Sequence, residues 1–355
     1  MFFYDLSCGL SKLGHSVTLY AAPGSKPPEP NGSLKYIRGS YGVVAPSFEY
    51  EAYKMYKEEI LSSDLIIDCA HAHPIAEQIA WFHREHKSKV LIVQNGVITT
   101  NLRCTPWNIV VGSSMWKKLV VQGISQFKDT PWEKSDFDFA MGQGFPEEEV
   151  HVIPWATNTE FYCPYPDAPY EKEDYLLFCG RPTPYKGLHT AIKLAEKTKV
   201  PLKIFSSVAQ PEHQFWRSYY IEMIDKAKAK GAKIELVEER IPFGHEQKRD
   251  LYRKAKALIF PVEAHEPFGL VVIEALSCGT PVVTSTLGTM PELVKQGETG
   301  FLCTTLEDYA EAINNIEQLS PEACRKDVVE RFDRMRIAQM YLDLHKELSK
   351  CRSMK

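Results

Sequence analysis

The sequence feature that most constrains the fold is an alternation of short apolar segments and amphipathic stretches that runs through the chain twice. Apolar segments of strand length alternate with stretches of helical period. The proline-rich stretch 163–172, CPYPDAPYEK, interrupts the alternation, which then restarts. The expected strands are 16–22, 34–37, 64–68, 90–93, 109–111 and 150–153 before this linker, and 175–179, 202–205, 233–237, 257–261 and 282–285 after it.

Alternation on both sides of one linker predicts two doubly wound, Rossmann-like α/β domains, because parallel strands need a helical crossover between them. The 355 residues suit two domains of moderate size. We expect an amino domain over 1–165, a second domain over 166–333, and a helix over 334–355 that returns to the amino domain. In such sheets ligands bind beyond the carboxyl ends of the strands, so the residues at those positions must indicate the function.

Composition excludes several classes of protein. The net charge of −4, without a basic excess in either half, argues against nucleic-acid binding. The apolar runs are too short for a membrane span, and no secretory signal is visible. The nine cysteines are scattered and never form a C-x-x-C pair, which favours reduced thiols in the cytoplasm over disulfides or a zinc site. The sequence does not indicate the oligomeric state.

Two loops in the second half carry the candidate chemistry. The segment CGRPTPYKG at 179–187 and the segment that leads from Glu263 to Pro281 each connect an expected strand to an expected helix. The free N–H groups at a helix N-terminus favour an anion at that position. Arg181 and Lys186 add positive charge there, in two forms that suit phosphate oxygens. The two loops therefore predict an anion site.

Glu266 and Glu274 lie eight residues apart. In a continuous helix this spacing is about 12 Å, more than the roughly 5–9.5 Å between the carboxylates of a glycosidase pair. The two carboxylates could instead hold the two ends of a nucleotide sugar. The backbone N–H groups of Phe268, Gly269 and Leu270 would then face its diphosphate. Because apolar residues surround Glu274, we expect its carboxylate to have either a ligand or a buried partner.

Three segments of the second half resemble the motifs of a known family. The segments GRPTPYKG at 180–187, EPFGLVVIEALSCGTPVV at 266–283 and PELVKQGETGFL at 291–302 resemble the retaining family-4 glycosyltransferases, which have the GT-B fold. The Glu-Pro-Phe-Gly variant is most similar to a subgroup that contains antibiotic-tailoring and pterin glucosyltransferases. The resemblance covers nearly the whole chain, but it is specific only between about 180 and 302.

The resemblance implies a role for each matched residue. Glu266 would contact the donor sugar and Glu274 the ribose, while Arg181 and Lys186 would contact the leaving diphosphate beside Gly180. It implies no metal and no cofactor, because protein cations would take the place of a divalent ion. The nucleoside-diphosphate sugar is then a substrate, and the acceptor is a small molecule or a glycan that the sequence does not identify.

The amino half matches the family more loosely. VHVIPWATNTEFY at 150–162 is similar to a family segment, although residues 155–158 depart from it. His71 and His73 follow an expected strand near the position of the family's active-site histidine, and their spacing does not decide between them. Asn95 and Gly96 could line an acceptor pocket. Family members begin with a strand and a glycine-rich loop, whereas this sequence begins in an expected helix, so we expect the amino domain to lack its first strand.

Three alternatives stay open at this point. A chain without that strand could be a catalytically impaired protein that only binds a nucleotide sugar. A phosphorylase or sugar-phosphate synthase of the same architecture is less favoured, because no segment for a pyridoxal phosphate lysine is evident. An NAD-dependent dehydrogenase needs G-x-G-x-x-G after a strand, and we find no such segment in the sequence.

Overall fold

A computed structural model describes residues 2–22, 25–36, 46–69, 73–94, 107–131, 133, 144–167, 170–206, 211–237 and 245–353. The chain forms two compact units. The first comprises residues 1–126, 139–156 and 333–355, and the second comprises residues 127–138 and 157–332. The domain limits expected from the linker remain a prediction. In this division residues 157–165 pack with the second unit.

The second unit is built on a six-stranded parallel sheet with the order β12-β11-β10-β7-β8-β9. The runs at 176–179 and 257–260 are continuously apolar, as expected for strands covered on both faces, whereas Lys203 and Glu235 interrupt the runs at 202–205 and 234–237. The strand positions expected from the sequence are confirmed, whereas the last strand was not foreseen. The strands are β7 (Leu176–Cys179), β8 (Leu202–Phe205), β9 (Ile234–Val237), β10 (Ala257–Phe260), β11 (Val282–Ser285) and β12 (Gly300–Cys303).

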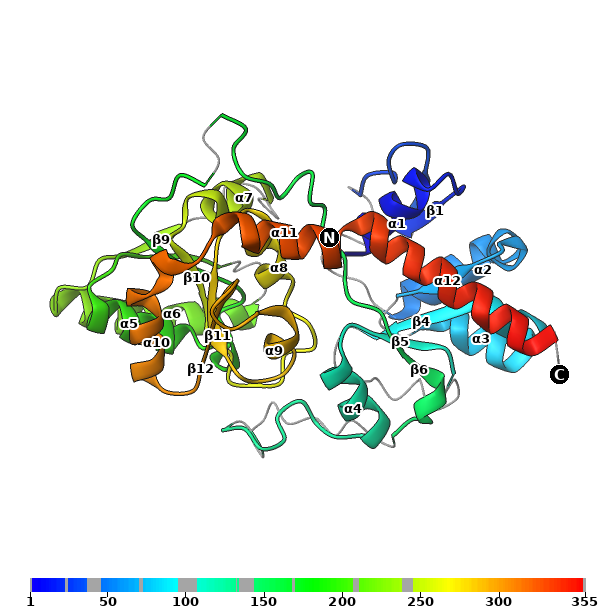
Figure 1. Cartoon of the computed structure of the whole chain (residues 1–355). Coiled ribbons are helices and arrows are strands. Elements are labelled where there is room, and N and C mark those ends of the chain that lie inside the picture. Colours follow the sequence, from blue (N-terminus) through cyan, green and yellow to red (C-terminus); the bar gives the residue numbers. More distant parts are fainter. Residues whose placement is uncertain are drawn as a thin grey trace. The chain divides into compact units, whose positions relative to one another are not determined.

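Helices cover both faces of this sheet (Figure 1). One packed group contains α5 (Leu188–Thr198), α6 (Pro211–Ala229) and α10 (Leu306–Asn314). The other group contains α7 (His245–Lys254), α8 (Leu270–Ser277) and α11 (Pro321–Phe332). The short elements are η4 (Pro184–Lys186), α9 (Met290–Leu293) and η5 (Ile316–Gln318). The doubly wound α/β class is therefore confirmed, and the crossover loops place their residues at the carboxyl ends of the strands.

The first unit contains two separate parallel ladders among its described residues. One is the pair β1–β2, and the other has the order β3-β4-β5-β6. The strands are β1 (Thr18–Ala21), β2 (Ser33–Tyr36), β3 (Ile66–Asp68), β4 (Val90–Gln94), β5 (Ile109–Val111) and β6 (Val150–Val152). That the amino domain lacks a first strand remains an expectation.

The helices of the first unit are α1 (Phe2–Lys12), α2 (Pro46–Ser62), α3 (Pro74–Phe82), η1 (Arg84–Lys89), α4 (Ser114–Gln122), η3 (Glu147–Glu149) and α12 (Arg334–Ser353). The sequence pattern also predicts a helix over 75–86, but this helix ends earlier, at Phe82, and is followed by the 3₁₀ helix η1. Helix α12 packs along α1, as Figure 1 also shows. Within the described ranges, every helix is too short or too polar to cross a lipid bilayer.

Candidate functional site

The loop after β7 carries the predicted cations. It turns through η4, and Gly187 then begins α5 in the left-handed region, with φ of 76°. A Cβ at this position would lie 1.9 Å from the carbonyl oxygen of Pro261, so both the backbone conformation and the close approach require glycine. The loop therefore packs directly against the chain that leaves β10. It buries Lys186, which is 8 % exposed, and leaves Arg181 exposed.

The loop after β10 carries Glu266, and a third loop holds it in place. Thr289 donates its hydroxyl to the carbonyl oxygens of Glu266 and Pro267, both at 2.8 Å. A Cβ at Gly288, whose φ is 60°, would lie 2.4 Å from the backbone nitrogen of Glu266. The turn that carries Glu266 is thus fixed by the chain that follows β11.

Lys186 and Glu266 meet as an ion pair. Their side chains are 10 % and 17 % exposed, and they leave β7 and β10, which are neighbours in the sheet. The Lys186 ammonium also lies 5.6 Å from the centre of the Phe260 ring. The sequence prediction took a diphosphate, and not the protein, as the main partner of Lys186. The structure instead gives this ammonium a carboxylate partner.

Glu274 lies on α8 and is 2 % exposed. Its two carboxylate oxygens are 3.0 and 2.9 Å from the Lys248 ammonium, and the Tyr252 hydroxyl donates to it at 3.1 Å. Burial raises the pKa of Tyr252, so this hydroxyl keeps its proton. We expected this carboxylate to have either a ligand or a buried protein partner, and the structure shows protein partners.

The backbone between the two glutamates is not one continuous helix. Helix α8 begins at Leu270, after Gly269, which has φ of 100°. The Phe268 side chain is buried and packs edge-on against Phe332, with ring centres 5.9 Å apart. Glu266 therefore lies in the turn before the helix, and the estimate of their separation from helical rise does not apply. The contacts predicted for the N–H groups of residues 268–270, and for Gly180, stay predictions.

In the first unit, His73 is the described one of the two candidate active-site histidines. It is buried at the start of α3, with its Nδ1 3.5 Å from Asp68 and its Nε2 3.2 Å from the amide nitrogen of Gln94. Its φ of 46° is unusual for a residue other than glycine, and such strain concentrates at functional sites. Asp68 and Gln94 end β3 and β4, so three polar side chains meet at the carboxyl edge of this sheet. His71, Asn95 and Gly96 lie outside the described residues.

Sequence reasoning missed several partners of the predicted residues. These are Lys248 and Tyr252 beside Glu274, and Asp68 and Gln94 beside His73. The only available signal was the cost of an unpaired buried carboxylate at Glu274, which demanded a partner without naming it. The partners of Glu274 and the pair of His73 with Gln94 are more than twenty residues apart, and such pairs have no spacing that a pattern could detect.

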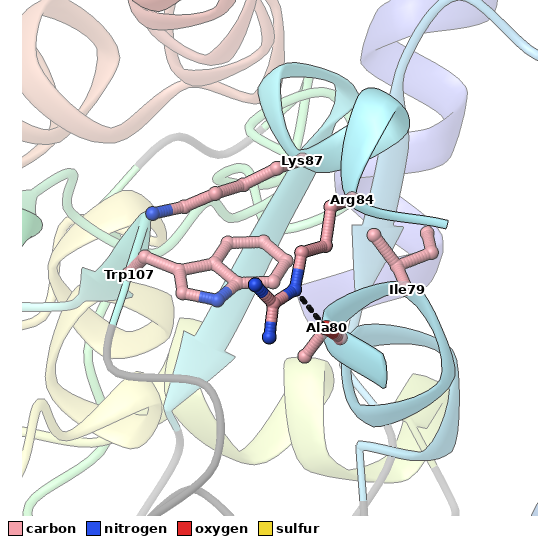
Figure 2. Close-up of a pocket in the computed structure, with 5 residues that line it drawn as sticks. All are labelled: Ile79, Ala80, Arg84, Lys87 and Trp107. Atoms are coloured by element: carbon pink, nitrogen blue, oxygen red, sulfur yellow. Dashed lines mark hydrogen bonds between the residues drawn. The ribbon is translucent and has the colours of Figure 1, made fainter. Parts of the chain in front are cut away.

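A separate cavity of about 320 Å³ lies in the first unit. It is lined by Ile79, Ala80, Arg84, Lys87 and Trp107, and Figure 2 shows Arg84 bonded to the Ala80 carbonyl, with Lys87 extending over the indole. Residues 84–89 precede β4 and Trp107 precedes β5, so the cavity belongs to the amino edge of the sheet. Ligands of parallel sheets bind at the opposite edge.

Comparisons with known proteins bear on the family and the fold of this chain. Residues 166–331 match the family model described as "Glycosyl transferases group 1". A probable sucrose-phosphate synthase from Thermosipho melanesiensis is 29 % identical over 216 residues, which is 56 % of this chain and 48 % of the relative. A D-inositol 3-phosphate glycosyltransferase from Streptomyces scabiei is 34 % identical over 140 residues, 36 % of this chain and 29 % of the relative. The chain thus spans about half the length, or less, of these curated relatives.

Solved structures resemble nearly the whole chain. The sucrose-phosphate synthase of Thermosynechococcus elongatus superposes with a TM-score of 0.71 at 19 % identity, over 98 % of this chain and 92 % of that one. The Anabaena protein HepE, solved in complex with UDP and glucose, gives a TM-score of 0.68 at 18 % identity, over 96 % and 94 %. At such identities the likeness establishes the fold. The chain therefore has the GT-B fold of these proteins, and its residues 166–331 match the family of the group 1 glycosyl transferases.

Proposed function

We propose that this chain is a glycosyltransferase that moves a sugar from a nucleoside-diphosphate sugar to an acceptor, with retention of the anomeric configuration and without a metal ion. The match to the group 1 glycosyl transferases over residues 166–331 supports the class of reaction. The Glu-Pro-Phe-Gly motif at 266–269 suggests the subgroup with antibiotic-tailoring and pterin glucosyltransferases. Retention, the kind of donor and metal independence rest on the motif resemblance.

The Lys186–Glu266 ion pair is the observation that carries the proposal. The Glu266 carboxylate can accept hydrogen bonds from hydroxyl groups, and the Lys186 ammonium can bind an anion. Because the two lie together at the ends of neighbouring strands, they suit a ligand whose hydroxyl groups adjoin an anionic group. A sugar diphosphate has this layout. On donor binding, the Lys186 ammonium would turn from Glu266 to the diphosphate, and Glu266 would accept hydrogen bonds from the sugar.

The chemical role of each group follows from the charges that change during transfer. Negative charge grows on the leaving diphosphate, so Lys186 and the exposed Arg181 stabilise the transition state more than the ground state. Positive charge grows at the anomeric carbon, where the Glu266 carboxylate is favourable. With retention, the acceptor hydroxyl adds on the face that the diphosphate leaves.

Glu274 would bind the ribose hydroxyls, which do not react. Lys248 and Tyr252 already hold its carboxylate in one orientation, so little side-chain entropy is lost when a ribose binds. Glu274 therefore contributes affinity for the nucleotide more than rate. On the acceptor side, we propose that His73 contacts the acceptor, with His71, Asn95 and Gly96 as further candidates.

A donor panel tests the proposal. The purified chain is incubated with UDP-, GDP- and ADP-sugars in the presence of EDTA, and release of the nucleoside diphosphate is followed with and without a library of acceptors. We expect slow hydrolysis of one donor and faster turnover with a suitable acceptor. The Lys186→Met variant should lose both activities. Binding without any turnover would favour the nucleotide-sugar-binding protein instead, and no binding of any donor would refute the proposal.

A further inference from the structure

A segment from the sequence of the amino half packs into the second unit. Residues 127–138 follow α4 and precede η3, two elements of the first unit, but they belong to the compact unit that contains Lys186 and Glu266. The Phe127 side chain is 1 % exposed there. Two hydrogen bonds hold the backbone of this segment locally. The Thr130 amide donates to the Phe127 carbonyl at 3.1 Å, and the Asp129 amide donates to the Glu133 carboxylate at 3.0 Å.

This segment contacts the two donor motifs next to their charged residues. The Phe127 ring packs edge-on against Tyr185, the residue before Lys186, with ring centres 5.3 Å apart. The carbonyl of the next residue, Lys128, lies 3.0 Å from Nε2 of His265, the residue before Glu266. Two adjacent residues of one segment thus hold the sequence neighbours of both members of the ion pair.

The hydrogen bonds of His265 determine its protonation state. The Gly288 amide donates to Nδ1 at 3.2 Å, so Nδ1 must be unprotonated. Nε2 then carries the proton and donates it to the Lys128 carbonyl. Through Gly288 the ring also reaches the chain that fixes the Glu266 turn, since Gly288 closely approaches the Glu266 backbone. One neutral imidazole therefore joins three segments: the one at 127–133, the Glu266 turn and the chain after β11.

Protonation of His265 would break the hydrogen bond from Gly288 but keep the one from Nε2 to the Lys128 carbonyl. A second ring proton on Nδ1 would face the Gly288 N–H, and the acceptor would be lost. Among the described residues, the charged groups of the packed segment are Lys128, Asp129 and Glu133, and the adjoining charges of the donor loops are Lys186 and Glu266. Burial lowers the pKa of His265, while the Lys128 carbonyl and Asp129 raise it.

We propose that His265 and Phe127 are positioning residues for transfer: neutral His265 fastens segment 127–133 to the donor loops and thereby holds Lys186 and Glu266 in register. The role in transfer rests on the proposed function, whereas the fastening itself does not. Neither side chain needs to touch the substrate. Loss of the contacts between this segment and the donor loops should lower kcat more than it raises KM, because Lys186 and Glu266 still carry their charges when they are misplaced.

Hydrogen exchange tests the fastening without any activity. The Gly288 amide reports on His265 directly, and the Asp129 and Thr130 amides report on the segment. In the wild type, we expect the Gly288 amide to exchange about tenfold faster at about pH 5 than at about pH 7.5, after correction for intrinsic rates, because its hydrogen bond to Nδ1 is lost, whereas the Asp129 and Thr130 amides should change less, because Nε2 still donates to the Lys128 carbonyl. In His265→Leu all three amides should exchange about tenfold faster than in the wild type already at about pH 7.5.

His265→Gln is the conservative variant. Its amide can accept from Gly288 and donate to Lys128 but cannot be protonated, so it should keep near wild-type protection and lose the pH dependence. His83→Gln is the matched control, because His83 is a partly exposed histidine of the first unit beside Glu85. It should keep both the protection and the pH dependence of the wild type.

Kinetics then tests the role in transfer. We expect His265→Leu and Phe127→Ala to lower kcat about tenfold with KM changed less than about threefold, and His265→Gln to remove the acid limb of the kcat profile that depends on this residue. Wild-type protection in His265→Leu, or an unchanged pH dependence in His265→Gln, would overturn the fastening. Altered protection with unchanged kcat would overturn the positioning role. If the wild type turns over no donor, the proposed function fails while exchange still decides the fastening.

Discussion

Isosteric substitution of the two glutamates separates their roles. Glu274 is 2 % exposed and bound by Lys248 and Tyr252, whereas Glu266 is paired with Lys186 at the neighbouring strand end. If Glu274 binds the ribose and Glu266 the sugar, then Glu274→Gln should weaken nucleotide binding and Glu266→Gln should slow transfer. Glutamine keeps the shape of each side chain, removes the charge and replaces one acceptor oxygen by an amide donor.

The structure sets the expected magnitudes. A hydrogen bond to a charged group contributes about 1.5–3 kcal/mol and a neutral one about 0.5–1.5 kcal/mol, so Glu274→Gln should lose about 1.4 kcal/mol of nucleotide binding. That is about a tenfold rise in Kd for the free nucleoside diphosphate. Glu266→Gln should lower kcat about 10²–10³-fold, as for other single groups that stabilise transition-state charge.

Binding of the free nucleoside diphosphate to Glu266→Gln should be as tight as to the wild type, or tighter. This ligand has no sugar for residue 266 to contact. In addition, the substitution removes the carboxylate that pairs with Lys186, so the ammonium becomes available to the diphosphate without first breaking an ion pair. Glu274→Gln should therefore raise the Kd for the nucleoside diphosphate, whereas Glu266→Gln should lower kcat without raising this Kd.

Calorimetric titration of UDP, GDP or ADP measures Kd, and single-turnover transfer measures the rate. Glu222→Gln is the matched control, because Glu222 lies in the same unit and is 70 % exposed beside Lys226. It should change neither quantity. Thermal unfolding of each variant checks that the fold is intact. Equal weakening of nucleotide binding in Glu266→Gln and Glu274→Gln would show that the pair does not span the donor.

Three further predictions concern lysine and arginine side chains of the second unit, and they differ because these side chains differ in burial. Lys248→Met leaves the buried Glu274 carboxylate without its cation, so we expect thermal unfolding of the second unit at markedly lower temperature, for a cost of about 3–5 kcal/mol; an unchanged Tm would contradict this. Arg181→Ala and Lys186→Ala should both slow transfer strongly, but only Lys186→Ala should change Tm, since Arg181 is exposed; unchanged turnover in either would refute its assignment. Burial lowers the pKa of Lys172 from its ordinary value of 10.5 to about 8, so between these two pH values the unfolded chain binds more protons than the folded one. The Tm of the wild type should therefore rise relative to that of Lys172→Met as pH increases through this range. A pH-independent difference in Tm would argue against this prediction.

The strand positions could be predicted because their cause is local. A run such as Leu176–Cys179 is apolar throughout, since helices cover both faces of its sheet, and the expected strands were found within a few residues. Strand β12 escaped prediction because Gly300–Cys303 is short and begins with glycine. The helix expected over 75–86 was too long, because the apolar period ends at Phe82 and charged residues follow.

The candidate site could be predicted only in part. The loops after β7 and β10 were identified, because their residues are contiguous and lie at predicted strand ends. The partners of Glu274 were not, since Lys248 and Tyr252 lie more than twenty residues away on another helix. The helical estimate for the two glutamates assumed a continuous helix and does not apply, because α8 begins only at Leu270.

By itself, the sequence determined the doubly wound class and the presence of Arg181, Lys186 and Glu266 between strands and helices, with Glu274 on the helix that follows, because periodicity and turn chemistry act over a few residues. The tertiary structure alone decided which charges meet. Lys186 and Glu266 are 80 residues apart and pair because β7 and β10 are neighbours in the sheet, and residues 127–133 pack beside them although α4 and η3 flank this segment. Such contacts depend on strand order and burial, which no local pattern specifies.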